Sequence, residues 1–180
     1  MARRAALGFK SHTGWAAAVA IAGGEVVLKR RIDMAHDFAT GAVFHAGQEM
    51  PLEKAKALIE SSEERFVSIA RAAIAAIVAE LRGAGCEVAA CGIAGGNPKP
   101  LPPLESILRS HALVHAAEGE LYRRAIGRAC AACGIQATRV AAGNAGALAA
   151  RIATLGRASG RPWAADQKEA ALAALIALEK

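Results

Sequence analysis

The chain has 180 residues, 54% of them hydrophobic, and a net charge of +6. This length is typical of one domain with a full core, so we expect a single domain spanning 1–180. About a quarter of the residues are alanine, which predicts close helix packing around few larger side chains. No uncharged apolar run approaches the roughly 18 residues of a membrane span. A cytoplasmic protein without a membrane partner is therefore predicted.

The positive charge permits a phosphate-rich partner such as a nucleic acid. The densest basic clusters are Lys29-Arg30-Arg31 and Arg123-Arg124 with Arg128. Only two Trp, one Tyr and four Phe occur, so a stacking platform for single strands is not expected.

The four cysteines do not suggest a disulfide framework in a chain of this size. Cys86 and Cys91 lie on one predicted strand at an odd separation, so they should point to opposite faces. Cys130 and Cys133 end a predicted helix before Gly134, whereas a redox pair usually begins one. Small buried side chains are favoured over a zinc site.

The N-terminal part reads as three antiparallel strands, because apolar runs are separated by turn residues. The strands are predicted at 5–10, 15–21 and 25–33, with a turn at 11–14 and a hairpin at Gly23-Gly24. The connection 35–50 has no regular period.

The rest of the chain alternates helices with two further strands. A long helix over 51–82 begins at a proline and ends at glycines. The remaining strands are predicted at 87–94 and 135–141. The remaining helices are predicted at 104–133, with breaks near Ser110 and Gly119, from Gly143-Asn144 to about 155, and at 164–178.

The order of these elements resembles that of the RNase H-like superfamily, nearest to the Holliday-junction resolvase group. The segment from Leu7 to Trp15 is similar to the opening strand and turn of that group, and Gly160 to Lys168 is similar to the start of its last helix. The resemblance implies an α/β fold with a mixed five-stranded sheet, order 3-2-1-4-5, and helices on both faces.

The resemblance also implies where metals would bind. In that group, carboxylates on the first strand, after the fourth strand and on the last helix hold two divalent metals for phosphodiester hydrolysis. Here Lys10 takes the first position, Ala94-Gly95 the second, and only Asp166 matches as an acid. A degenerate catalytic site is therefore expected, with Lys10 paired to Asp166. A helix N-cap is the alternative role for Asp166.

A polar stripe stands out within 110–122. At helical spacing His111, His115, Glu118 and Tyr122 share one face. Two histidines and a carboxylate would suit zinc or manganese, but hydrogen-bonded histidines packed against the sheet are favoured. We expect this stripe to approach the same cleft as Lys10 and Asp166.

Two loops invite a phosphate-binding interpretation. Gly95, Gly96 and Asn97 follow a strand, but prolines rather than a Gly-Lys-Ser sequence come next, which favours a structural turn. The turn that contains Lys10, Ser11 and Thr13 is similar to the phosphate loop of actin-like ATPases, but lacks their magnesium-binding Asp. These loop residues, with His111, His115 and Tyr122, are the candidate ligand-binding set.

Three functions remain open. The first is a non-catalytic binding protein for structured nucleic acid or a nucleoprotein, without a cofactor. The second is a nuclease or phosphodiesterase that uses Mg²⁺ or Mn²⁺ and draws on Glu118, Glu120 and Asp166. The third is an assembly protein without a ligand. A homodimer through the 51–82 helix is expected in any case, because the apolar stripe from Ile59 to Leu81 is longer than one small sheet can cover.

Overall fold

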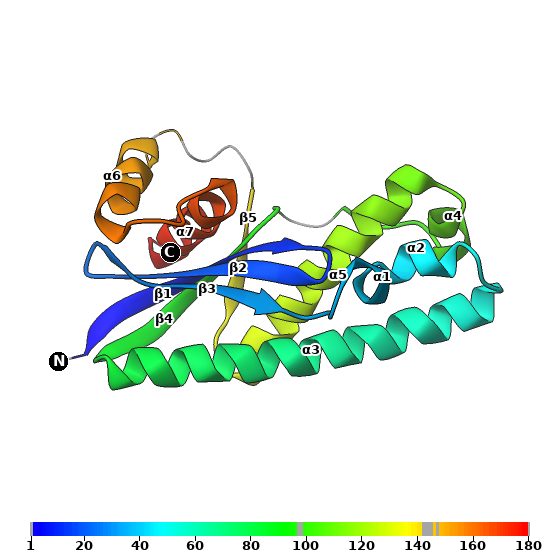
Figure 1. The fold of residues 1–180 in the computed structure, drawn as a ribbon, viewed down its shortest axis with the longest axis horizontal. Coiled ribbons are helices and arrows are strands. Elements are labelled where there is room, and N and C mark those ends of the chain that lie inside the picture. Colours follow the sequence, from blue (N-terminus) through cyan, green and yellow to red (C-terminus); the bar gives the residue numbers. More distant parts are fainter. Residues whose placement is uncertain (1, 97–98, 142–145, 147, 180) are drawn as a thin grey trace.

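In the computed structural model, which describes residues 2–96, 99–141, 146 and 148–179, five strands form one mixed sheet (Figure 1). Their order is β3-β2-β1-β4-β5. β1 pairs antiparallel with β2 and β2 with β3, whereas β4 runs parallel to both β1 and β5. This topology confirms the predicted sheet. The strands are β1 (Arg3–His12), β2 (Trp15–Ala22), β3 (Glu25–Asp33), β4 (Cys86–Ala94) and β5 (Ala137–Val140).

The first three strands follow the glycine pattern of the sequence. Gly23 and Gly24 both have positive φ, at 59° and 83°, which is the backbone that a tight two-residue hairpin turn requires. β1 is longer than predicted, because Ser11 and His12 continue its pairing with β2. Lys10 and Ser11 are therefore strand residues, and the turn contains only Thr13 and Gly14.

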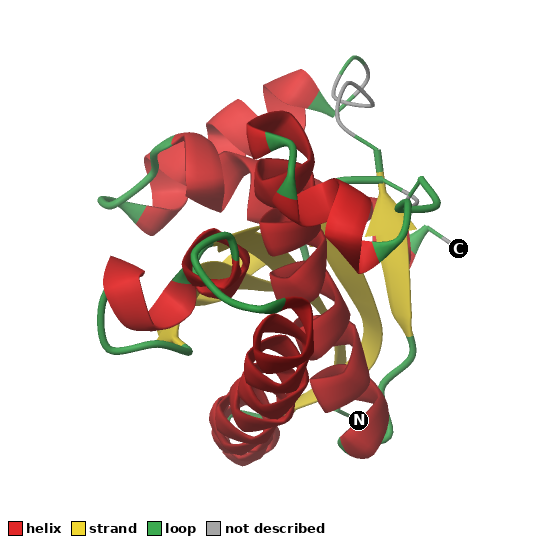
Figure 2. Ribbon diagram, turned by 90° about the vertical axis from the view of Figure 1, so that its right-hand side faces the viewer, coloured by secondary structure: helices red, strands yellow, loops and turns green. Residues whose placement is uncertain are grey.

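Helices cover both faces of the sheet, as predicted (Figure 2). No helix in the described part of the chain is long and apolar enough to cross a membrane. The predicted helix from Gly143-Asn144 has its start outside the described residues. The helices are α1 (Phe38–Gly41), α2 (Val43–Gly47), α3 (Leu52–Gly83), α4 (Leu104–Leu108), α5 (His111–Ala132), α6 (Ala149–Ser159) and α7 (Ala165–Leu178).

Two local predictions about helices were wrong. The connection 35–50 is not irregular, because it contains α1 and α2, and Asp37 caps α1 by accepting a hydrogen bond from the Thr40 amide at 2.8 Å. α5 runs through Gly119 without a break. A single helical glycine costs only about 1 kcal/mol relative to alanine, which the packing of a long helix exceeds.

The apolar stripe of α3 is buried within the chain rather than exposed for a partner. Ile59, Phe66, Ile74 and Leu81 are all at most 7% exposed, because α3 packs on α5 and α2 as well as on β3 and β4. At the centre of this interface Phe66 stacks on the Tyr122 ring, with centroids 4.9 Å apart. The stripe therefore gives no reason to expect a dimer. Self-association remains a prediction, but the α3 stripe no longer supports it.

The other face of the sheet is covered by α7 at very short range. Its alanines Ala170, Ala173 and Ala174 are fully buried and lie over glycines of the two central strands, Gly8 on β1 and Gly92 on β4. A side chain at either glycine would overlap the α7 backbone. The small alanine side chains thus allow the close helix packing that the composition predicted, here between a helix and the strands of the sheet.

An irregularity in β4 changes which residues face the core. The pairing with β1 shifts after Val88, so that Ala5 pairs with Val88 but Ala6 with Ala90. At this point β4 contains one residue more than β1, which is a β-bulge. Beyond the bulge, the side chains of β4 point to the faces opposite to those that strict alternation predicts. Cys86 and Cys91 therefore face the same core cluster, and the prediction of opposite faces was wrong.

Candidate functional site

Two carboxylates of α7 are paired with basic side chains where β1 ends beside the start of α7. The Lys10 ammonium is 2.7 Å from Glu169 Oε2, and His12 Nε2 is 2.7 Å from Asp166 Oδ1. The His12 ring also stacks on Trp15, with centroids 4.4 Å apart. We call these four residues, Lys10, His12, Asp166 and Glu169, the β1-end cluster.

The β1-end cluster differs in detail from the expected arrangement. Lys10 pairs with Glu169 rather than with Asp166, because α7 presents both acids one turn apart and His12 occupies the first. Asp166 lies inside the first turn of α7, whose N-cap is Ala164, so Asp166 is not the N-cap. His12 and Glu169 were not among the predicted site residues. The longer β1 strand, which carries His12 to the level of α7, is what the sequence did not reveal.

The donor set of the β1-end cluster does not fit a two-metal centre. A pair of divalent metals needs several free carboxylates. Both acids here are already paired, one with Lys10 and the other with His12. The end of β4 adds Ala94 rather than an acid. A lysine at the first position opposes metal binding through its own charge.

The loop after β4 lies at the same end of the sheet, because Phe9 pairs in parallel with Ile93. The amides of Gly95 and Gly96 both donate to the Val140 carbonyl, at 2.9 and 2.8 Å. They are therefore engaged by the chain itself rather than directed at a phosphate, and the structural-turn interpretation fits. Asn97 lies outside the described residues.

The other two members of the predicted loop set differ in their surroundings. Ser11 is nearly buried, and its hydroxyl has no hydrogen-bond partner among the described residues. Thr13 is half-buried in the β1–β2 turn. Neither environment identifies a ligand.

Glu120 joins α5 to β5 through Arg139 and also pairs with Arg123 on its own helix. Its carboxylate accepts hydrogen bonds from Arg123, at 3.1 Å, and from Arg139. Burial lowers the pKa of the Arg139 guanidinium, and the Glu120 charge opposes this shift. Glu120 is thus engaged in a structural ion pair, and the structure does not bring it together with Glu118 and Asp166, each of which pairs with a different histidine.

The polar stripe of α5 forms a second cluster, away from the β1-end cluster. Figure 1 places the start of α5 beside α2 and α4, whereas α7 covers β1 and β4. His111 and His115 come from α5 and meet His45 from α2, and the potential ligand nitrogens of the three lie within 4.8 Å of one another. We call these three residues the histidine cluster. The prediction that this stripe shares a cleft with Lys10 and Asp166 is not supported.

Behind the histidine cluster, Glu118 and Tyr122 fix the α1–α2 segment. Glu118 is 1% exposed, and its Oε2 atom is 2.8 Å from His45 Nδ1. The Tyr122 hydroxyl donates to the Gly41 carbonyl at 2.8 Å, and burial raises the pKa of Tyr122. The stripe therefore packs against the α1–α2 segment rather than against the sheet, and His45 is the member that sequence periodicity did not reveal.

The comparisons with known proteins bear on the fold. No protein-family model and no curated protein matches this sequence. Among solved structures, the chain is similar to T. thermophilus RuvC in complex with Holliday junction substrate, with a TM-score of 0.56 and 10% sequence identity. The match covers 96% of this chain and 90% of that one. The chain therefore shares the fold of that structure, the RNase H-like α/β fold that the order of its elements predicted.

Proposed function

We propose that this protein is a non-catalytic RNase H-like domain that binds structured nucleic acid. The observation that carries the proposal is the β1-end cluster, where Lys10 and His12 engage the two acids of α7. Because both acids are already paired, the cluster offers no free carboxylate to a magnesium ion.

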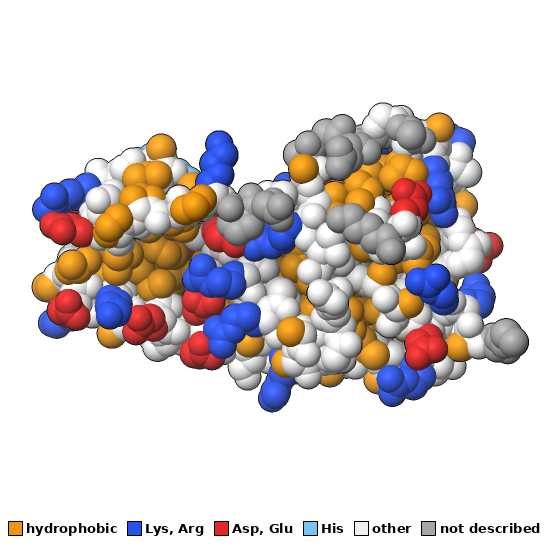
Figure 3. Space-filling model, turned by 180° about the vertical axis from the view of Figure 1, so that it is seen from behind, with side chains coloured by type: hydrophobic (Ala, Val, Ile, Leu, Met, Phe, Trp, Pro, Cys, Tyr) orange, Lys and Arg blue, Asp and Glu red, His pale blue; other side chains and the backbone are white. Residues whose placement is uncertain are grey.

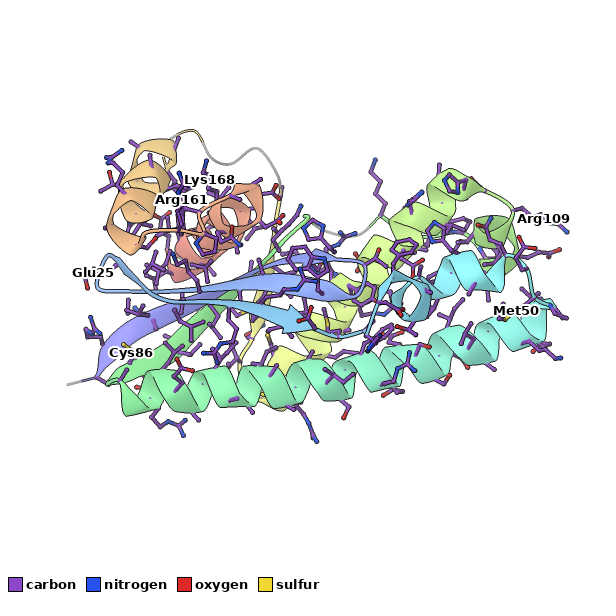
Figure 4. All side chains as sticks on the ribbon, viewed as in Figure 1. Glu25, Met50, Cys86, Arg109, Arg161 and Lys168 are labelled. Carbon is purple, nitrogen blue, oxygen red and sulfur yellow. The ribbon has the colours of Figure 1, made fainter. Side chains whose placement is uncertain are left out.

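Two further observations support a nucleic-acid partner. The fold matches a protein that was solved with a Holliday junction, and this chain carries a net charge of +6. At the start of α7, Lys168 and Arg161 are exposed (Figure 4) and have no carboxylate within ion-pairing distance in the described part of the chain. Seen from behind, basic and acidic side chains are intermixed over the surface (Figure 3). The α7 side is therefore the proposed binding surface.

The first prediction compares two double variants that change the net charge equally. R161E/K168E reverses the two exposed cations near the start of α7, and its control is K54E/K56E, two exposed lysines at the start of α3. Fluorescence anisotropy with a synthetic four-way DNA junction, measured over a salt series, should show weaker binding by at least tenfold for R161E/K168E. The slope of log K against log salt should fall by about 0.9 for each phosphate that this variant no longer neutralises.

The control separates a local surface from overall charge. K54E/K56E should bind the junction nearly as well as the wild type, apart from a small long-range effect. Equal losses in both variants would mean that net charge alone attracts DNA. No binding by the wild type at low salt would refute the proposed function.

The second prediction concerns Lys10→Asp. This change places a third carboxylate beside Glu169 and Asp166 and removes the ammonium that holds Glu169, so we expect the variant to gain measurable Mg²⁺ and Mn²⁺ binding by calorimetry. Lys10→Asn is the control, because it removes the charge without adding an acid. Tight Mg²⁺ binding by the wild type would show that the β1-end cluster is a working metal centre.

A further inference from the structure

We infer that the histidine cluster is a binding site for a divalent transition metal, with Zn²⁺ as the best match. His45, His111 and His115 each offer one imidazole nitrogen, and these nitrogens lie within 4.8 Å of one another. Imidazole suits zinc and related ions, and three histidines with a fourth position open to solvent is an established zinc coordination. This site is separate from the β1-end cluster and does not depend on the proposed function.

The spacing is close to what zinc requires. Ligand nitrogens about 2.0–2.1 Å from a tetrahedral zinc are roughly 3.3 Å apart. His111 Nε2 and His115 Nε2 are already 3.0 Å apart, since one helical turn separates them on α5. The widest pair needs to close by about 1.5 Å at most, if the three nitrogens are to share one tetrahedral ion.

Glu118 fixes the orientation of His45. Its Oε2 atom lies 2.8 Å from His45 Nδ1, so the neutral ring donates from Nδ1 and keeps a lone pair on Nε2 for a metal. A carboxylate on the far nitrogen of a metal-binding histidine is a recurring arrangement, and it both orients the ring and strengthens it as a ligand.

The buried charge of Glu118 gives a second reason to expect a metal at the histidine cluster. Glu118 is 1% exposed, and its only ion-pair partner in the described part of the chain is His45. Burying a carboxylate without a full positive charge nearby is unfavourable. A divalent cation on His45 would place that charge one imidazole ring away. His111 and His115 are exposed, so the ion has a route from solvent.

Metal binding would join two parts of the fold that the chain order separates. His45 lies on α2, and the other two ligands lie on α5. The ion would therefore fix the α1–α2 segment against α5, in line with the Tyr122 hydrogen bond to Gly41. Binding of this kind stabilises the folded state in proportion to the logarithm of free metal concentration.

The test is Zn²⁺ binding by the whole chain, measured by competition with a chromophoric chelator, together with the thermal midpoint. The wild type should bind one Zn²⁺ per chain and melt at a higher temperature with zinc. His111→Ala and His115→Ala should each weaken binding at least tenfold and remove the zinc-dependent rise. Both positions are exposed, so these variants should fold without metal.

Two further variants test whether zinc binding is specific to the histidine cluster and depends on Glu118. His36→Ala is the matched control, because His36 is exposed and its ion-pair partner within the described residues is Asp37 alone; it should bind zinc as the wild type does. Glu118→Gln should weaken binding about 10- to 100-fold, as removal of such a partner typically does. No zinc binding by the wild type, or an equal loss of affinity in the His36 variant, would overturn the inference.

Discussion

Alanine at Gly8 or at Gly92 is expected to displace α7 from the sheet and to destabilise the protein severely. A Cβ atom at Gly8 would lie 1.8 Å from the Ala170 carbonyl oxygen, and one at Gly92 would lie 2.0 Å from the Ala173 carbonyl oxygen. Both clashes are with helix backbone, so no side-chain rotation relieves them. Overpacked cores are usually destabilised by about 1–3 kcal/mol, and we expect an effect at or above that range.

Neither glycine has a positive φ, so the expected effect comes from steric overlap alone. Gly83→Ala is the matched control, because nothing lies within 4 Å of its added Cβ and it ends α3. It should be neutral, or more stable by up to about 1 kcal/mol. Urea unfolding followed by circular dichroism measures all three variants. A Gly8→Ala midpoint equal to that of the wild type would contradict the observed packing.

Phe66→Glu is expected to unfold the monomer rather than to separate a dimer. Phe66 is fully buried and stacks on Tyr122 at 4.9 Å between centroids, and a carboxylate there would be removed from water at the centre of the core. Loss of the ring alone costs about 3–5 kcal/mol, and the buried charge adds to it. Thermal unfolding of the purified variant, with sedimentation for its mass, tests this expectation.

Ile69→Glu is the comparison on the same helix. Ile69 is 38% exposed, so a charge there should change stability by less than about 0.5 kcal/mol. If Phe66→Glu remained folded and only changed the sedimentation of the protein from dimer to monomer, the stripe would be an interface and the packing described above would be wrong.

The sequence was sufficient for most of the sheet and for the long helix. Apolar alternation and the Gly23-Gly24 turn predicted the three antiparallel strands, and the helical period predicted α3 to within a residue or two. What covers the α3 stripe could not be predicted, because α1 and α2 have only four and five residues. Such helices are too short to show a period, and they are held in place by a hydrogen bond that Glu118 accepts and one that Tyr122 donates.

The candidate sites were predicted only in part. Helical spacing placed His111 and His115 together, but His45 is far away in the sequence and joins them only through the packing of α2 on α5. The resemblance brought Lys10 and Asp166 to one end of the sheet, whereas their actual partners depend on how far β1 extends and on the rotation of α7. Side-chain pairing of that kind is a tertiary property, which no local pattern encodes.

The most direct test of the central claim is a cleavage assay on a junction that the protein has bound. A labelled four-way DNA junction is incubated with the wild type in Mg²⁺ or Mn²⁺ at concentrations that give full binding, and the strands are then separated on a denaturing gel. Because Lys10 and His12 already engage the acids of α7, we predict that the junction is bound and remains uncut. Cleavage that requires the metal and is abolished in Asp166→Asn would contradict the account.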